Sequence, residues 1–126
     1  MRILVVDDSS TMRRIVINAV QKLNLGEIVQ AENGVDAIMK IKEFAGKIDL
    51  ILMDINMPKL DGVSTLKELR AARVTMNIPI IMVTSESEAE KVIECIEAGA
   101  NDYVVKPFTP NVLMEKIKNI MPVPQG

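Results

Sequence analysis

The fold is decided by the stretch Leu50-Ile51-Leu52-Met53-Asp54-Ile55-Asn56-Met57-Pro58, in which four consecutive apolar residues end in an acid. An uninterrupted apolar run of this length is typical of a strand that is covered on both faces, as in a parallel sheet between two helix layers. Pro58 favours a turn soon after the strand ends. Asp54 is therefore predicted at the carboxyl edge of a buried sheet, where an acid is a candidate functional residue.

The same pattern recurs along the chain. Five short runs rich in apolar and β-branched residues are predicted as strands, at Arg2–Val6, Glu27–Ala31, Asp49–Met53, Pro79–Val83 and Asp102–Val105. Amphipathic stretches separate them; Thr11–Leu23, for example, carries Ile15, Ala19, Val20 and Leu23 at helical spacing, as a face for the sheet. Strict alternation of strands and helices predicts a doubly wound α/β domain with a parallel sheet.

Length and composition limit the classes of function. The 126 residues, 48% of them hydrophobic, suffice for one core, so we expect one domain over residues 1–121 followed by a tail at 122–126. With 15 basic and 17 acidic residues, the chain lacks the positive charge expected for nucleic-acid binding. No apolar run approaches the ~20 residues that span a bilayer, so we expect a cytoplasmic protein without membrane insertion.

Residue counts also restrict the chemistry. The chain has one cysteine, Cys95, and no histidine, which excludes disulfides within the chain, cysteine-based zinc sites and histidine-dependent catalytic dyads. Any chemistry is therefore expected to rest on carboxylates.

The candidate chemical groups all follow strands. Asp7 and Asp8 follow the first predicted strand, Asp54 the third, Thr84 the fourth and Lys106 the fifth. Because ligands of open parallel sheets bind beyond the carboxyl ends of the strands, these side chains are predicted to share one site. Each alone has a structural interpretation, as a helix-terminal charge, a turn residue or a solvated lysine. Their placement at one edge favours function.

The chemistry follows from the cluster of acids. Two carboxylates about 5 Å apart repel each other by roughly 3 kcal/mol at an effective dielectric constant of ~20, unless they are protonated, paired with Lys106 or bound to a metal. Among metals, Mg²⁺ suits carboxylate, carbonyl and water oxygens and keeps positions open for a phosphate. Asp54 is then predicted to be a nucleophile for a phosphoryl group, assisted by Lys106 and by the hydroxyl of Thr84.

These residues carry a resemblance to a known family. The segment Ile3-Leu4-Val5-Val6-Asp7-Asp8, together with Asp54, Thr84 and Lys106-Pro107-Phe108, resembles the receiver domain of two-component response regulators. Within the family, residues 8–15 and 103–109 are most similar to stand-alone, CheY-like chemotaxis regulators. The resemblance covers nearly the whole chain and implies a flavodoxin-like fold with five helices and the strand order 2-1-3-4-5.

The resemblance also implies a role for each site residue. Asp54 becomes the phosphorylated residue, and Mg²⁺ is held by Asp7, Asp8, Asp54 and the backbone carbonyl of Asn56. Lys106 becomes the cation that pairs with the phosphoryl group, and its peptide bond to Pro107 is expected to be cis.

Four residues receive switch or tuning roles from the resemblance. Thr84 becomes the switch hydroxyl, and Tyr103 becomes the aromatic residue that turns inward with it and changes the face formed by the last two helices and the last strand. Asn56 and Glu86 are implied to tune the attack of water on the phosphoryl group, which predicts fast self-dephosphorylation.

Several functions remain open at this point. The main expectation is a monomeric switch, not an enzyme in its own right, that takes phosphoryl groups from a chemotaxis-type histidine kinase or small donors and binds the flagellar motor switch or another target. A phosphatase that acts on it is a further candidate partner. Alternatives are a phosphorelay intermediate, a receiver of a larger regulator, an aspartyl-phosphate phosphatase and a flavodoxin-like electron carrier. The phosphatase is disfavoured by Asn56, which stands where such enzymes carry a second aspartate, and the electron carrier by the three acids and few aromatic residues.

Overall fold

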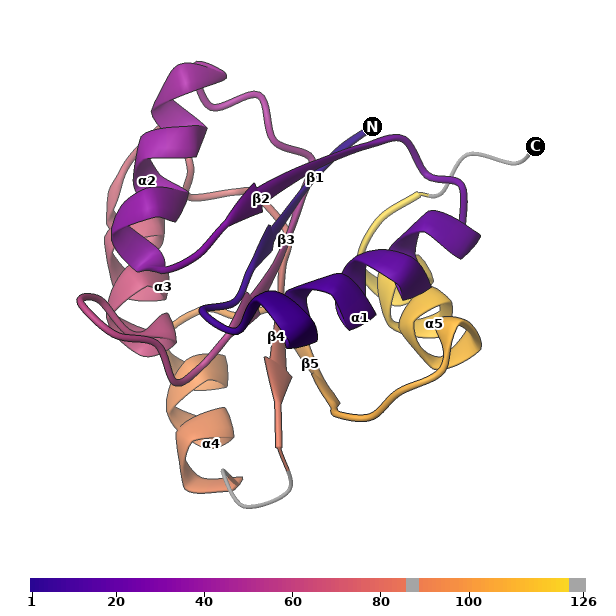
Figure 1. Ribbon diagram of the computed structural model, residues 1–126. Coiled ribbons are helices and arrows are strands. Elements are labelled where there is room, and N and C mark those ends of the chain that lie inside the picture. The colour runs from indigo at the N-terminus through magenta and orange to yellow at the C-terminus, as the bar shows by residue number, and fades with distance from the viewer. Residues whose placement is uncertain (86–88, 123–126) are drawn as a thin grey trace.

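The computed structural model describes residues 1–85 and 89–122, in which five strands alternate with five helices (Figure 1). The elements are β1 (Arg2–Val6), α1 (Ser10–Lys22), β2 (Glu27–Ala31), α2 (Gly34–Glu43), β3 (Leu50–Asp54), α3 (Gly62–Ala71), β4 (Ile80–Thr84), α4 (Ala89–Glu97), β5 (Asp102–Val105) and α5 (Pro110–Ile120). The five strands lie within a residue or two of the predicted runs. The predicted tail begins at Pro122, and its last four residues lie outside the described part.

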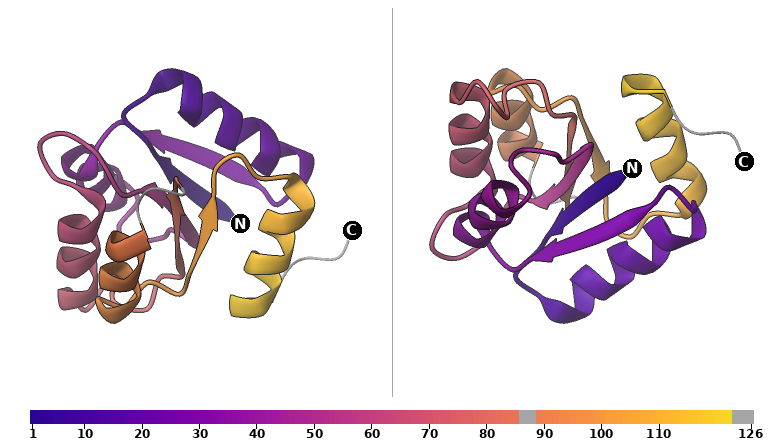
Figure 2. Two further views of the ribbon diagram at one scale, coloured as in Figure 1. Left: turned by 90° about the horizontal axis from the view of Figure 1, so that it is seen from below. Right: turned by 90° about the horizontal axis from the view of Figure 1, so that it is seen from above.

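The strands form one parallel sheet with the order β2-β1-β3-β4-β5. This order confirms the predicted doubly wound, flavodoxin-like architecture. All carboxyl ends of the strands therefore lie at one edge of the sheet, which is at the bottom of Figure 1 and faces the viewer in the left panel of Figure 2.

Two helix layers cover the sheet, with α1 and α5 on one face and α2, α3 and α4 on the other (Figure 2). Successive strand residues point to opposite faces, so β1, β3 and β4 each supply both layers. Leu4 and Ile51 pack in the core beneath α2 to α4, whereas Ile3 and Leu50 pack beneath α1 and α5. All four side chains are fully buried, which contributes about 1.5–3 kcal/mol each relative to exposure. This explains the uninterrupted apolar runs.

Helix α1 corrects one detail of the prediction. Ile15 was expected on the face toward the sheet, but its side chain is half exposed, and Val16 is buried together with Ala19 and Val20. These three residues are spaced i, i+3 and i+4 and form a continuous stripe. Ile15 lies on the adjacent face of the helix, so the interpretation of its role was wrong.

A guanidinium group ties together the loops at the opposite edge of the sheet. Arg70, at the end of α3, donates hydrogen bonds to the carbonyl oxygens of Gly99, Met76 and Ile78 and to Oδ1 of Asn101, at 2.8–3.1 Å. The Asn101 side chain in turn accepts a hydrogen bond from the backbone N–H of Ile80, at the start of β4. Burial lowers the pKa of Arg70 from its usual value. Arg70 therefore joins the loop that leads into β4 to the loop that leads into β5.

We expect Arg70→Met to destabilise the protein by about 2–3 kcal/mol, because hydrogen bonds from charged groups contribute about 1.5–3 kcal/mol and several carbonyl groups lose their donor. Urea denaturation followed by circular dichroism measures this change. Arg73→Met removes an exposed guanidinium from the following loop and serves as the matched control. Equal stability of the two variants would contradict a structural role for Arg70.

Candidate functional site

The predicted site residues meet at the carboxyl edge of the sheet. Asp54 and Thr84 are the last residues of β3 and β4, Asp7 and Asp8 follow β1, and Lys106 follows β5. Because β1 and β3 are neighbours in the sheet, their carboxyl ends bring the acids together. The structure thus brings together all five residues that follow the predicted strands.

The three acids form one cluster. Asp7, Asp8 and Asp54 each offer a carboxylate oxygen, and these oxygens lie within 4.8 Å of one another. Asp7 and Asp54 are buried, whereas Asp8 is exposed. The cluster therefore has a closed side in the sheet and an open side toward solvent.

Lys106 lies between the two buried acids. Its Nζ is 3.6 Å from Oδ2 of Asp7 and 3.7 Å from Oδ1 of Asp54, and its side chain is largely buried. Its backbone N–H donates to the carbonyl oxygen of Thr84 at 2.7 Å, which continues the pairing of β4 and β5 to this point. One ammonium group thus partly neutralises two carboxylates, at distances longer than a hydrogen bond.

Backbone groups fix the two buried carboxylates. The N–H of Ser9 donates to Oδ1 of Asp7 at 2.9 Å, and the N–H of Ile55 donates to Oδ1 of Asp54 at 2.8 Å. Arg13 in α1 donates to the carbonyl oxygen of Asp7 at 2.6 Å and so holds the loop after β1. These contacts therefore position both buried carboxylates.

The cluster fits a divalent cation. Oδ2 of Asp7 is buried, and no hydrogen-bond donor reaches it in the part of the chain that the structure describes. A buried carboxylate oxygen without a donor is unfavourable unless a cation binds it. Together with oxygens from Asp8 and Asp54, it forms a set of hard ligands that suits Mg²⁺.

Two of the residues with implied switch roles have defined surroundings. The hydroxyl of Thr84 is buried and donates to the carbonyl oxygen of Ser85 at 3.2 Å. Tyr103 faces outward with 38% of its surface exposed, and Nζ of Lys116 lies 5.2 Å from the centre of its ring. The peptide bond between Lys106 and Pro107 is cis, as the resemblance implied.

The structure describes only one of the two residues that the resemblance implies to tune dephosphorylation. Asn56 lies in the loop after β3, where its side chain is exposed and accepts a hydrogen bond from Lys91. Glu86 lies outside the described residues.

Gly62 packs against the chain that carries Asp54, and the sequence analysis assigned it no role. It is the first residue of α3, and its N–H donates to the carbonyl oxygen of Ile55 at 2.7 Å. A Cβ atom at this position would collide with the carbonyl oxygen of Asp54 and lie 2.8 Å from Cα of Ile55. Gly62 therefore allows α3 to pack directly against the chain that carries Asp54.

We expect Gly62→Ala to destabilise the protein by about 1–3 kcal/mol, the usual effect of overpacking, because a backbone contact must open. Urea denaturation measures the loss, and Ser64→Ala, in the same first turn of α3, is the control. An unchanged denaturation midpoint for Gly62→Ala would show that the loop after β3 yields easily.

Comparison with known proteins agrees with this geometry. Residues 3–118 match the response regulator receiver domain family, which covers most of the chain. The chain belongs to this family. Its membership confirms the receiver resemblance that Asp7, Asp8, Asp54 and Lys106 carried in the sequence.

Sequence comparison shows which members of the family this receiver is similar to. It is 44% identical to chemotaxis protein CheY1 of Helicobacter pylori over 121 residues, which cover 96% of this chain and 97% of the relative. It is 41% identical to a chemotaxis protein CheY homologue of Campylobacter jejuni, with 100% of this chain and 96% of that protein covered. The receiver is thus similar to CheY-type chemotaxis proteins over their full length.

Solved structures show the same architecture. Chemotaxis protein CheY4 of Vibrio cholerae superimposes with a TM-score of 0.84 at 32% identity, covering 95% of this chain and 98% of that one. A putative response regulator of Chloroflexus aurantiacus gives a TM-score of 0.86 at 32% identity, covering 94% and 95%. None of the described helices is long and apolar enough to cross a membrane.

Proposed function

We propose that this receiver is a Mg²⁺-dependent phosphoaspartyl switch in which Asp54 accepts a phosphoryl group from a histidine kinase. The observation that carries the proposal is the placement of Lys106 between the buried carboxylates of Asp7 and Asp54. A lysine and three acids at one open edge form a site for a phosphoryl group and its cation.

Asp54 acts as the nucleophile in this proposal. One of its carboxylate oxygens forms a bond to phosphorus while the bond from phosphorus to the donor's histidine nitrogen breaks, and that nitrogen keeps the electron pair and takes up a proton. The Ile55 N–H holds Oδ1 of Asp54 at 2.8 Å, which orients the carboxylate without removing its charge.

The other residues stabilise the charge of the transferred group. Lys106 is close enough to follow it, since its Nζ already lies 3.7 Å from Asp54. Asp7, Asp8, Asp54 and the carbonyl of Asn56 would hold Mg²⁺. When bound, the metal supplies charge that stabilises the transferring oxygens.

The output of the switch is assigned to the face of α4, β5 and α5. Ile93 and Tyr103 are exposed there and border an apolar pocket of about 560 Å³ whose lining also includes Thr84. A change in Thr84 on phosphorylation can therefore reach the Tyr103 surface through directly adjacent residues. A target protein that binds this face would read the state of Asp54.

Similarity to CheY-type relatives supports a role in chemotaxis for this switch. We propose a chemotaxis-type histidine kinase as donor, a flagellar motor switch protein as target and a phosphatase as a further partner of a cytoplasmic monomer. Residues 1–121 would form the receiver domain. Its own reactions would be restricted to self-phosphorylation from small donors and to hydrolysis of the phosphoaspartate, tuned by Asn56 and Glu86.

Intact-mass spectrometry after incubation with acetyl phosphate tests the proposal. With Mg²⁺ we expect a mass gain of one phosphoryl group, and with a chelator we expect none, because the acid cluster then lacks its cation. The hydroxylamine sensitivity of the gained group would identify it as an acyl phosphate. No gain in folded protein, even at short times after mixing, would contradict the switch.

A further inference from the structure

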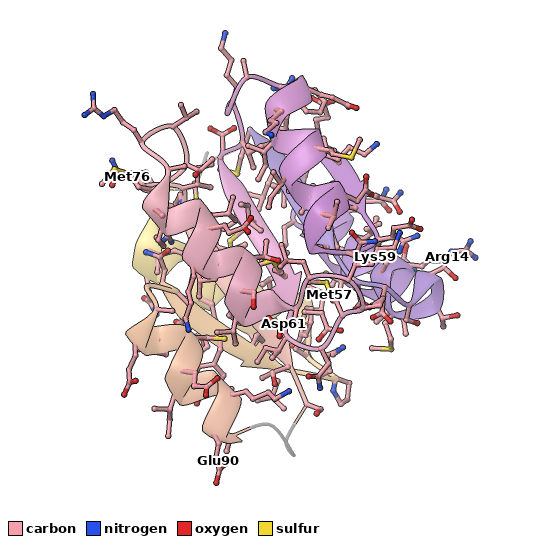
Figure 3. The ribbon with its side chains drawn as sticks, turned by 90° about the vertical axis from the view of Figure 1, so that its left-hand side faces the viewer. Arg14, Met57, Lys59, Asp61, Met76 and Glu90 are labelled. Carbon is pink, nitrogen blue, oxygen red and sulfur yellow. The ribbon has the colours of Figure 1, made fainter. Side chains whose placement is uncertain are left out.

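A hydrogen bond between side chains connects α4 to the loop after β3. Nζ of Lys91 donates to Oδ1 of Asn56 at 2.8 Å, across 35 residues of sequence. Figure 3 shows the two segments on the same side of the molecule, with Met57, Lys59 and Asp61 in the loop and Glu90 at the start of α4. The contact bridges the loop after β3 and the first turn of α4.

The loop presents Asn56 at a defined position. Its neighbours Ile55 and Met57 are both buried in the core beneath α2 to α4, which anchors the backbone on either side of the exposed Asn56 side chain. Asn56 follows Asp54 by two residues in this loop. Lys91 therefore contacts a side chain in an anchored loop, two residues after Asp54.

Lys91 is a cation whose charge no described acid neutralises. No carboxylate lies within ion-pair distance of it in residues 1–85 and 89–122. A phosphorylated Asp54 would add about one to two negative charges two residues before the Asn56 that Lys91 contacts. Phosphorylation would thus strengthen the attraction that holds Lys91 in place.

We propose that Lys91 is a positioning residue that holds the Asn56 side chain across the approach to Asp54 and thereby slows the attack of water on the phosphoryl group. This inference rests on the proposed function and adds a residue of α4 to the control of the phosphorylated lifetime. Hydrolysis requires a water molecule in line with the bond that breaks, and a side chain fixed across that line excludes it.

The test measures decay of the phosphorylated protein. Wild type, Lys91→Ala, Lys91→Arg, Asn56→Ala and the double variant Lys91→Ala/Asn56→Ala are phosphorylated with acetyl phosphate, desalted, and followed by intact mass in Mg²⁺. We expect decay of Lys91→Ala to be about 2–10-fold faster than wild type, as the loss of one hydrogen bond implies. Lys91→Arg should restore the wild-type rate.

The double variant shows whether Lys91 changes the decay rate through Asn56 or independently of it. If Lys91 acts through Asn56, removing Lys91 changes nothing further once Asn56 is Ala. Lys67→Ala, which removes an exposed lysine from α3, should decay like wild type, and urea midpoints should be equal for Lys91→Ala and Lys67→Ala. A purely structural role would shift the midpoint and leave the decay rate unchanged.

Two results would overturn the proposal while leaving the switch intact. These are a wild-type decay rate for Lys91→Ala, and additive effects of the Lys91 and Asn56 substitutions. Absence of phosphorylation in the wild type would instead overturn the proposed function, and the role of Lys91 with it.

Discussion

Asp54→Asn is expected to abolish the mass gain from acetyl phosphate and to leave the fold intact. An amide is too weak a nucleophile to displace the donor, so incorporation should fall below detection. The amide oxygen occupies the place of Oδ1 and can still accept the hydrogen bond from the Ile55 N–H, so the loop after β3 keeps its anchor.

The same substitution should stabilise the protein when Mg²⁺ is absent. Asp7 and Asp54 now share one ammonium group at 3.6 and 3.7 Å, and removing one of two neighbouring carboxylates leaves a balanced pair of Asp7 and Lys106. Removing the repulsion between the two buried carboxylates stabilises the folded protein, whereas losing the ion pair between Asp54 and Lys106 destabilises it. With screening included, we expect a net increase of about 1 kcal/mol in the free energy of unfolding. Urea denaturation in a chelator measures the gain, which should reverse in Mg²⁺.

Asp61→Asn is the matched control for both measurements. Asp61 is an exposed acid seven residues further along the same segment, where its side chain caps α3 by accepting from the N–H of Ser64. Because Asn caps helices as well as Asp does, stability and phosphorylation should both stay at wild-type values. Phosphorylation of Asp54→Asn, or its loss in Asp61→Asn, would contradict Asp54 as the acceptor.

The sequence was sufficient to predict where the site lies. Apolar runs that end in acids specify both a buried strand and a polar edge, and parallel pairing brings those ends together without further information. Asp7, Asp8, Asp54 and Lys106 were therefore placed correctly from local patterns. The fold class followed from the same runs, since every predicted strand is separated from the next by a helix-length segment.

Contacts between distant side chains could not be predicted in this way. The hydrogen bond between Lys91 and Asn56 and the bonds of Arg70 depend on how α3 and α4 pack, which no local pattern encodes. The need for glycine at position 62 could not be predicted either, because it arises from close contact with the backbone of Asp54 and Ile55. Ile15 was misassigned since two adjacent apolar residues in a helix point to different faces, and only tertiary packing selects between them.

Lys106→Met is expected to have the largest combined effect on stability and function. Removing the ammonium leaves Asp7 and Asp54 buried without their cation, and breaking a buried ion pair typically destabilises by about 3–5 kcal/mol. Because the site opens toward solvent at Asp8, we expect about 2–4 kcal/mol in a chelator. Phosphorylation from acetyl phosphate should slow at least ~100-fold, the usual loss when a positioned group that stabilises transition-state charge is removed.

Mg²⁺ distinguishes an electrostatic cause from a packing defect. If uncompensated carboxylates destabilise Lys106→Met, a cation bound by them should recover most of the loss, and stability should rise more steeply with Mg²⁺ concentration than in wild type. Lys116→Met is the control, because it breaks an ion pair with Asp102 that is more exposed and contributes about 0–1 kcal/mol. A packing defect would respond to Mg²⁺ no more than wild type does.

The double variant Lys106→Met/Asp54→Asn tests whether the two side chains interact. In the double variant only the Asp7 carboxylate remains buried without a cation, so Lys106→Met should destabilise the Asp54→Asn protein less than it destabilises wild type. The difference is the coupling energy between Lys106 and Asp54, expected at about 1–3 kcal/mol for residues in one charged network. Strictly additive destabilisation in a chelator would mean that Lys106 and Asp54 do not interact at the measured 3.7 Å, and would remove the observation on which the proposed phosphoryl site rests.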